Sequence, residues 1–158
     1  MMPKNEQTST VDIDETDRKL LNGLLKDSRQ SFRQLAKGVG VSVATALTRV
    51  RNLEEAGVIR SYTCLLDYEK LGYDIGVLIQ LKISKGKLFE VEGKIATHPN
   101  VSIVHDVTGA FDAIIIAKFR SRRAMDAFLK KIQTYDFVER TETQIILNTL
   151  KEAPVAVE

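Results

Sequence analysis

Cysteine is almost absent from the 158-residue sequence, and histidine is nearly as rare. The single cysteine, Cys64, has no partner for an internal disulfide, and its apolar neighbours at 62–66 predict a buried small residue rather than a reactive thiol. The two histidines offer no metal site. His98 stands at an expected helix end, and His105 and Asp106, adjacent on an expected strand, point to opposite faces. We therefore expect neither a bound metal nor another resident cofactor.

Long apolar runs and a strong charge of one sign are also missing. No stretch approaches the ~18 apolar residues of a membrane span, and the N-terminus shows no signal-peptide pattern. We therefore expect a cytoplasmic protein with no membrane partner. The net charge of +2 does not indicate a nucleic-acid binder by itself, so any basic surface must be local. The apolar and charged fractions, 44% and 28%, are typical of a soluble folded protein.

Signatures of catalysis are missing as well. The sequence contains no spacing that would place a nucleophile, a base and an acid together, and it contains no glycine-rich phosphate loop. We therefore expect the protein not to be an enzyme.

The chain divides into regions with different residue patterns. Residues 1–11 form a polar tail without a period, residues 12–60 show helical patterns, and residues 75–150 alternate between strand and helix patterns. Residues 61–74 are expected to be a connecting strand and a linker, and the strand pattern itself covers residues 58–66. Residues 151–158 are expected to be a second tail. The length allows one ordinary domain or two small ones.

The helical region predicts three helices. Asp14 can cap the first, which should end near residues 26–27. Ser31 and Gln34 form a capping box for a short second helix, which glycines at 38 and 40 end. Ser42 caps a third helix over 43–56. A helix, a short helix, a turn with glycine and a further helix form the helix-turn-helix arrangement.

The third helix has the composition of a DNA-reading helix. A helical wheel turns Ala46, Leu47, Val50 and Leu53 inward. Small residues and threonines on the outer face permit entry into the major groove, and arginine can contact guanine or phosphate. Residues 29–60 carry six basic against two acidic side chains, in a chain that is otherwise balanced. The expected partner is double-stranded DNA, and the expected contacts are Arg29, Arg33, Ser42, Ala44, Thr45, Thr48, Arg49, Arg51 and Asn52.

The second region alternates between two periods. Residues 75–83, 101–107, 113–119 and 138–150 read as strands, and helices are expected after residue 87 and after Ser121, the first ending before residues 99–100. The order βαββαβ is that of a ferredoxin-like unit. The predicted fold class is α+β: an N-terminal helix-turn-helix domain joined by a linker to a C-terminal βαββαβ domain. A four-stranded sheet covered by two helices on one side leaves its other face to be buried, which predicts a homodimer.

Many of these residues match one known pattern. In the helical region they are Ile13, Asp14, Asp17, Arg18, Leu21, Arg29, Leu35, Ala36, Val41, Ser42, Arg49, Val50, Leu53, Glu54, Gly57, Val58 and Ile59, and the match continues through residues 108–112 into the last strand. The chain resembles the feast/famine, or leucine-responsive/asparagine-regulator (Lrp/AsnC), family of transcriptional regulators over about residues 12–150. The resemblance implies a winged helix-turn-helix domain and an amino-acid-responsive (RAM) domain. It also implies dimers that can form tetramers or octamers.

The resemblance further implies that the turn between the second and third strands contacts an amino-acid effector between subunits. Gly109 permits a positive φ and a close backbone approach, and free N–H groups of such a turn can receive a carboxylate. Asp112 offers a negative charge that either meets the effector's ammonium group or braces the loop. The expected effector residues are His105, Thr108, Gly109, Ala110, Phe111, Asp112, Thr141 and Thr143, the two threonines contributing from a neighbouring subunit.

Three alternatives stay open at this stage. The stretch from Gly109 to Asp112 is also compatible with an ordinary hairpin turn. The protein could be an effector-independent architectural DNA-binding protein, or an orphan regulator of the same fold that is controlled by its own concentration. The sequence names neither an effector nor the target genes.

Overall fold

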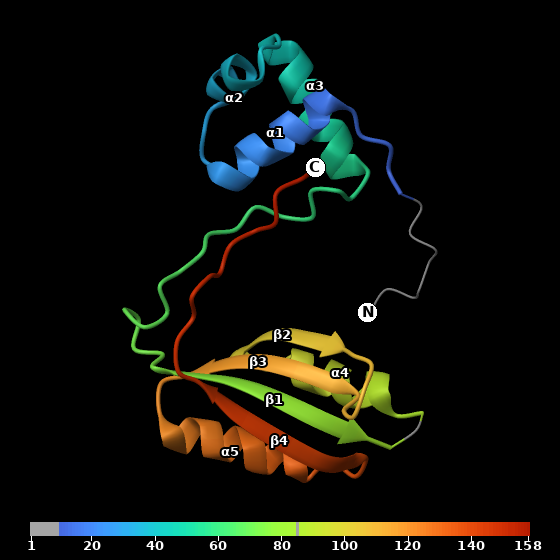
Figure 1. Ribbon diagram of the computed structural model, residues 1–158, viewed down its shortest axis with the longest axis vertical. Helices are drawn as coiled ribbons and strands as arrows, with labels where there is room; N and C mark the ends of the chain where they lie inside the picture. Colours follow the sequence, from blue (N-terminus) through green and yellow to red (C-terminus); the bar gives the residue numbers. More distant parts are fainter. Residues whose placement is uncertain (1–9, 85) are drawn as a thin grey trace. The chain divides into compact units, whose positions relative to one another are not determined.

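The computed structural model describes residues 10–84 and 86–158, which form two compact units (Figure 1). The first unit contains residues 10–65 together with Lys151–Glu158, and the second contains the described residues of Leu66–Leu150. The first is helical and the second is built on a sheet. The chain therefore passes between the units twice, once through residues 65–66 and once through residues 150–151.

The first unit holds three helices, which are α1 (Glu15–Lys26), α2 (Phe32–Val39) and α3 (Val43–Glu55). Their starts lie where the capping residues predict. Asp14 and Asp17 form a reciprocal capping box at α1, Ser31 and Gln34 form another at α2, and Ser42 caps α3. Each cap satisfies backbone N–H groups that the first turn of a helix leaves without a partner.

A small apolar core joins the three helices. Its buried members are Leu20, Leu35, Ala36, Ala46 and Val50. Gly23 sits where α1 meets α2: a Cβ there would lie 2.7 Å from Leu35 Cδ1, so glycine permits the close contact. One prediction was wrong, because Leu47 is 49% exposed. It lies one position beyond the buried stripe of α3, and a three-helix core is too small to cover that side.

The second unit has the predicted βαββαβ order. Its elements are β1 (Ile75–Ile83), α4 (Leu88–Ala96), β2 (Val101–Asp106), β3 (Ala113–Phe119), α5 (Arg122–Gln133) and β4 (Val138–Ile146). The four strands form one antiparallel sheet in the order β2-β3-β1-β4, the arrangement of a ferredoxin-like domain (Figure 1).

Both helices of this unit pack on one face of the sheet. Ile79 lies opposite Ile115 in the β1–β3 register, and both are fully buried on that face. The helices contribute Val91 and Ile95 from α4 and Phe128 and Ile132 from α5 to the same core. The alternate positions Leu78, Gln80, Ile114 and Ile116 point to the opposite face and are only half-buried. The sheet thus has one covered face and one face that the two helices leave open.

Three expectations about the chain between and after the elements were wrong. Residues 58–66 form no strand, because no strand within 10–84 or 86–158 pairs with them; Tyr62 instead donates to the Glu54 carboxylate at 2.6 Å. Cys64, expected to be buried, is exposed because its segment lacks that pairing. The last strand ends at Ile146, not at residue 150. No helix in the described ranges is long and apolar enough to span a membrane.

Candidate DNA-binding surface and effector pocket

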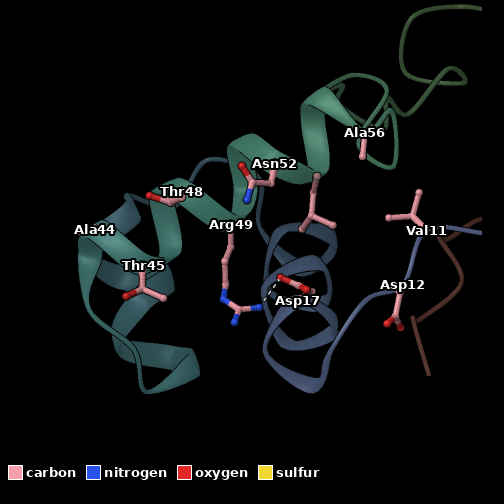
Figure 2. Close-up of a pocket in the computed structure, with 10 residues that line it drawn as sticks. Val11, Asp12, Asp17, Ala44, Thr45, Thr48, Arg49, Asn52 and Ala56 are labelled. Atoms are coloured by element: carbon pink, nitrogen blue, oxygen red, sulfur yellow. Dashed lines mark hydrogen bonds and ion pairs between the residues drawn. The ribbon is translucent and has the colours of Figure 1, made fainter.

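The outer face of α3 lines a hollow of about 730 Å³ (Figure 2). Five predicted DNA contacts meet there, namely Ala44, Thr45, Thr48, Arg49 and Asn52. All except Arg49 are exposed, as their place on the outer face predicts. Val11, Asp12 and Asp17 form the opposite wall. The side chains near the N-terminus of α3 are therefore small and mostly polar, where a recognition helix meets base edges.

The remaining predicted DNA contacts lie around this hollow. Ser42 serves first as the cap of α3, and its hydroxyl oxygen lies 2.8 Å from that of Thr45. Arg51 donates from Nε to Glu55 at 2.8 Å along the same helix, and both side chains are exposed. Breaking such an exposed ion pair costs little free energy, so the arginine can turn to a DNA phosphate. Arg29 and Arg33 are exposed near the start of α2.

The side chain of Arg49 is held by two acids, which the sequence did not predict. Its Nη1 donates to Asp17 Oδ1 at 3.0 Å (Figure 2) and to Asp14 Oδ2 at 2.6 Å. The two bonds tie α3 to the start of α1. These two bonds, that to Asp14 first, raise the pKa of Arg49. The pKa of Asp14 is lowered mainly by the N–H of Asp17 and then by Arg49. The sequence predicted a capping role for Asp14 but no ion pair with Arg49, because the approach of α1 to α3 is a tertiary contact.

The second candidate site surrounds the loop between β2 and β3. Val107 N donates to the Asp112 carbonyl oxygen at 2.9 Å and closes the loop. Gly109 has φ +123, as its predicted role requires. Apart from Gly109 itself and its two chain neighbours, no described residue has a heavy atom within 4 Å of the place where a Cβ would stand. A larger residue at this position would therefore meet backbone strain rather than a clash within this chain.

Asp112 acts as a brace for this loop. Its Oδ1 accepts from Lys82 Nζ at 2.9 Å, and its Oδ2 accepts from the backbone N–H of Ile83 at 2.8 Å. The N–H of Ile83 and then the Lys82 ammonium group lower the pKa of the Asp112 carboxyl. Its own N–H donates to the Leu81 carbonyl oxygen at 2.8 Å. Of the two roles that the sequence left open, this arrangement displays the brace.

A hollow of about 790 Å³ lies between the loop and the open face of the sheet. Its walls are Gln80, Asp106, Val107, Thr108, Ala110, Phe111 and Ile114. Three of these, Thr108, Ala110 and Phe111, are predicted effector residues. No sequence pattern predicted Gln80 at this site, because its position depends on the strand register that sets it opposite Ile114. The guanidinium group of Arg140 lies 5.4 Å from the centre of the Phe111 ring and extends this wall.

The other predicted effector residues lie outside this hollow. His105 pairs with Ile114 and so shares the open face of the sheet, whereas Asp106 pairs with Ala113 on the covered face. Thr141 pairs with Leu81 and Thr143 with Ile79, which sets both threonines on the helix-covered face. Gln133 of α5 donates to Thr141 Oγ1 at 3.2 Å. A contribution from these threonines to a neighbouring subunit stays a prediction.

A buried acid on α4 escaped the sequence analysis. Glu92 is 5% exposed, and its Oε1 accepts no hydrogen bond from the part of the chain that the structure describes. Burial, and then the charge of Asp106, raise the pKa of Glu92. Glu92 follows Leu88 by four residues and precedes Ile95 by three, so its place on the apolar stripe was available as a signal.

Comparisons with known proteins match both halves of the chain. A model described as winged helix-turn-helix DNA-binding matches residues 13–60, and the Lrp/AsnC ligand binding domain matches residues 76–156. An HTH-type transcriptional regulator of Pyrococcus furiosus is 45% identical over 142 residues, which are 90% of this chain and 96% of that protein. The HTH-type transcriptional regulator FL11 of Pyrococcus horikoshii is 34% identical, with 90% and 94% covered.

Solved structures show the same likeness. AsnC of Escherichia coli superimposes with a TM-score of 0.85 at 30% identity, covering 93% of this chain and 100% of that one. A Neisseria meningitidis transcriptional regulator, solved as a complex with L-methionine, has a TM-score of 0.84 at 25% identity, with 93% and 97% covered. These relatives are transcriptional regulators and not enzymes. Because family models match both halves of the chain, and a relative 45% identical extends over nine-tenths of it, the chain belongs to the Lrp/AsnC family of DNA-binding transcriptional regulators.

Proposed function

We propose that this regulator binds a specific operator as a homodimer or a larger even-numbered assembly, and that an amino acid bound beside the β2–β3 loop changes its DNA affinity or its assembly. Its expected place of action is the cytoplasm. The observation that carries the proposal is the hollow between residues 107–111 and the open sheet face in a domain of the Lrp/AsnC ligand-binding type.

The chemistry of the hollow suits a zwitterion. Backbone N–H groups of the loop around Gly109 can receive the α-carboxylate, because successive free N–H groups form an anion-binding concavity. Gln80 is on the wall, and its side-chain amide oxygen can accept hydrogen bonds from the ammonium group. Phe111 and Ile114 supply apolar surface for a side chain. The relative solved with L-methionine supports an amino acid as the ligand class.

The open sheet face supports self-association. Leu78, Ile114 and Ile116 are half-buried there, and both helices lie on the other side. A sheet with one uncovered apolar face is completed by a second layer, which a second copy of the chain provides. A two-fold dimer would present two copies of α3 to half-sites about one helical turn, or a multiple of it, apart.

Two measurements test the proposal. A thermal-shift screen against the twenty amino acids should find at least one that raises the melting temperature, because a ligand that binds only the folded state stabilises it by mass action. A footprint on genomic DNA should protect a pseudo-palindrome. Uniform protection without sequence preference, together with no amino acid that shifts the melting temperature, would favour the architectural alternative.

A further inference from the structure

The C-terminal segment 153–158 returns to the helical unit and binds α1. The side-chain amide of Asn22 donates from Nδ2 to the Val157 carbonyl oxygen at 2.8 Å, and its Oδ1 accepts from the Val157 N–H at 2.9 Å. Arg18 donates from Nε to the backbone oxygen of Glu158 at 2.8 Å. The C-terminal end of the chain accordingly lies beside α1 in Figure 1.

The pairing is built from complementary groups. Asn22 presents one N–H and one oxygen to a single residue, which is the exchange that two strand residues make in a hydrogen-bonded pair. Arg18 and Asn22 are four residues apart and so share one face of α1. Within the segment Val157 is half-buried, whereas Val155, two residues earlier, is 87% exposed. The contact is therefore local to residues 157–158.

The position of this contact gives it a mechanical consequence. The chain leaves the helical unit at Leu65 and returns at Lys151, so the segment is a second covalent connection between the two units. It ends on the helix whose first turn holds Arg49 of α3 through Asp14 and Asp17. A force on the end of β4 can thus act on α1 directly, and not only through residues 66–74.

We propose that the outer face of α1 around Arg18 and Asn22 is a docking site for the chain's own segment 153–158, and that this segment is a strap that restrains the DNA-binding domain. Docking does not require an effector, so the proposal stands or falls separately from the function proposed above. The residues that fill this site are 157 and 158, because all three hydrogen bonds use their backbone atoms.

Amide hydrogen exchange of the full-length protein, followed by NMR, tests the docking. The Val157 N–H should exchange at least about tenfold more slowly than in an unstructured peptide, because a hydrogen-bonded amide must open before it exchanges. Asn22→Ala should remove this protection. Asn52→Ala, which truncates an asparagine of α3 instead, serves as the matched control and should leave the protection intact. Exchange of the wild-type Val157 amide at the peptide rate would overturn the proposal.

The restraint and the identity of the docked chain need separate measurements. NMR relaxation should show faster independent tumbling of the DNA-binding domain in Asn22→Ala than in wild type, with the tumbling of the sheet domain unchanged. Equal tumbling of the DNA-binding domain in the two proteins would contradict a strap.

Mixed dimers identify the chain on which the segment docks. In these dimers, ¹⁵N-labelled Asn22→Ala chains are combined with unlabelled wild type. If the labelled Val157 amide regains protection there, the segment docks on a second copy, and docking within one chain is wrong.

Discussion

Arg49 donates to Asp17 across the DNA-binding domain, with Nη1 3.0 Å from Oδ1, so a side chain of the recognition helix is fixed by the first helix. Asp14 accepts from the same nitrogen at 2.6 Å. An arginine held between two carboxylates can approach a DNA phosphate in only two ways. Either its ion pairs break, or the two carboxylates come close to the phosphate and repel it. Arg49 therefore has a structural role as well as any role in DNA contact, and Arg51, paired only along its own helix, is the freer of the two arginines.

The two arginines should respond differently to substitution. Arg49→Ala is expected to lower the melting temperature of the DNA-binding domain and to weaken operator binding, because it leaves two carboxylates without their shared partner. Arg51→Ala should weaken operator binding with little change in the melting temperature, since its pair with Glu55 is exposed to solvent. Circular dichroism melting and fluorescence anisotropy at fixed salt check both. Undiminished stability of Arg49→Ala would refute the structural role.

The same contact predicts sensitivity to acid. The Asp17 N–H and Arg49 lower the pKa of Asp14 in the folded state, so the stability they confer is present above the ordinary pKa of about 4 and is lost as the pH falls through the folded value. Asp14→Asn keeps a capping oxygen and removes the charge. Its melting temperature should therefore fall less steeply than that of wild type between about pH 5 and pH 3. If the melting temperatures of the two proteins fall equally steeply with pH, the charge of Asp14 contributes nothing to stability.

Sequence patterns predicted the elements well because their determinants are local. Asp14, Ser31, Ser42 and Ser121 each cap the helix expected of them, and alternation predicted where each of the four sheet strands starts. The predictions that were wrong concern residues whose contacts depend on partners distant in the sequence. The segment at 58–66 has strand composition but no partner strand in the chain as described, and Cys64 is exposed with it.

The candidate sites divide in the same way. Residues 108–111 could be predicted as a turn because glycine is a local signal, and Gly109 does adopt a positive φ; their contact with an effector stays a prediction. Gln80 was missed because register sets it beside that turn, and the bond from Lys82 to Asp112 is also a tertiary contact. Asn22 was missed because its partner is 135 residues away in the sequence.

Glu92 should make the sheet domain less stable as the pH rises. Burial raises its folded-state pKa, so the folded protein binds more protons than the unfolded one above pH ~4.3, and stability declines until the folded pKa is passed. Glu92→Gln removes the charge and keeps the shape. Its urea midpoint should exceed that of wild type at pH 8 and approach it at pH 4. A lower midpoint for the glutamine variant at pH 8 would show that the Glu92 carboxylate has a stabilising partner in the assembled protein.

Two loop substitutions should have separable effects. Gly109→Val imposes a side chain on a φ of +123 and should cost about 1 kcal/mol or more in unfolding free energy. Asp112→Asn keeps an oxygen for the Ile83 N–H and loses the ion pair with Lys82. It should therefore lower stability only slightly. Isothermal titration with the amino acid that gives the largest thermal shift then separates the two roles of Asp112: undiminished affinity in Asp112→Asn indicates a brace, and lost affinity in a folded dimer indicates a ligand.

The most direct test of the proposed function is operator affinity measured with and without each of the twenty amino acids at one salt concentration. The account predicts that at least one amino acid changes the affinity of wild type by about fivefold or more, the usual range of coupling between two sites. Gly109→Val should retain the affinity measured without amino acid and lose the change. If no amino acid alters the wild-type affinity, or if Gly109→Val responds as wild type does, amino-acid control through the β2–β3 loop is contradicted.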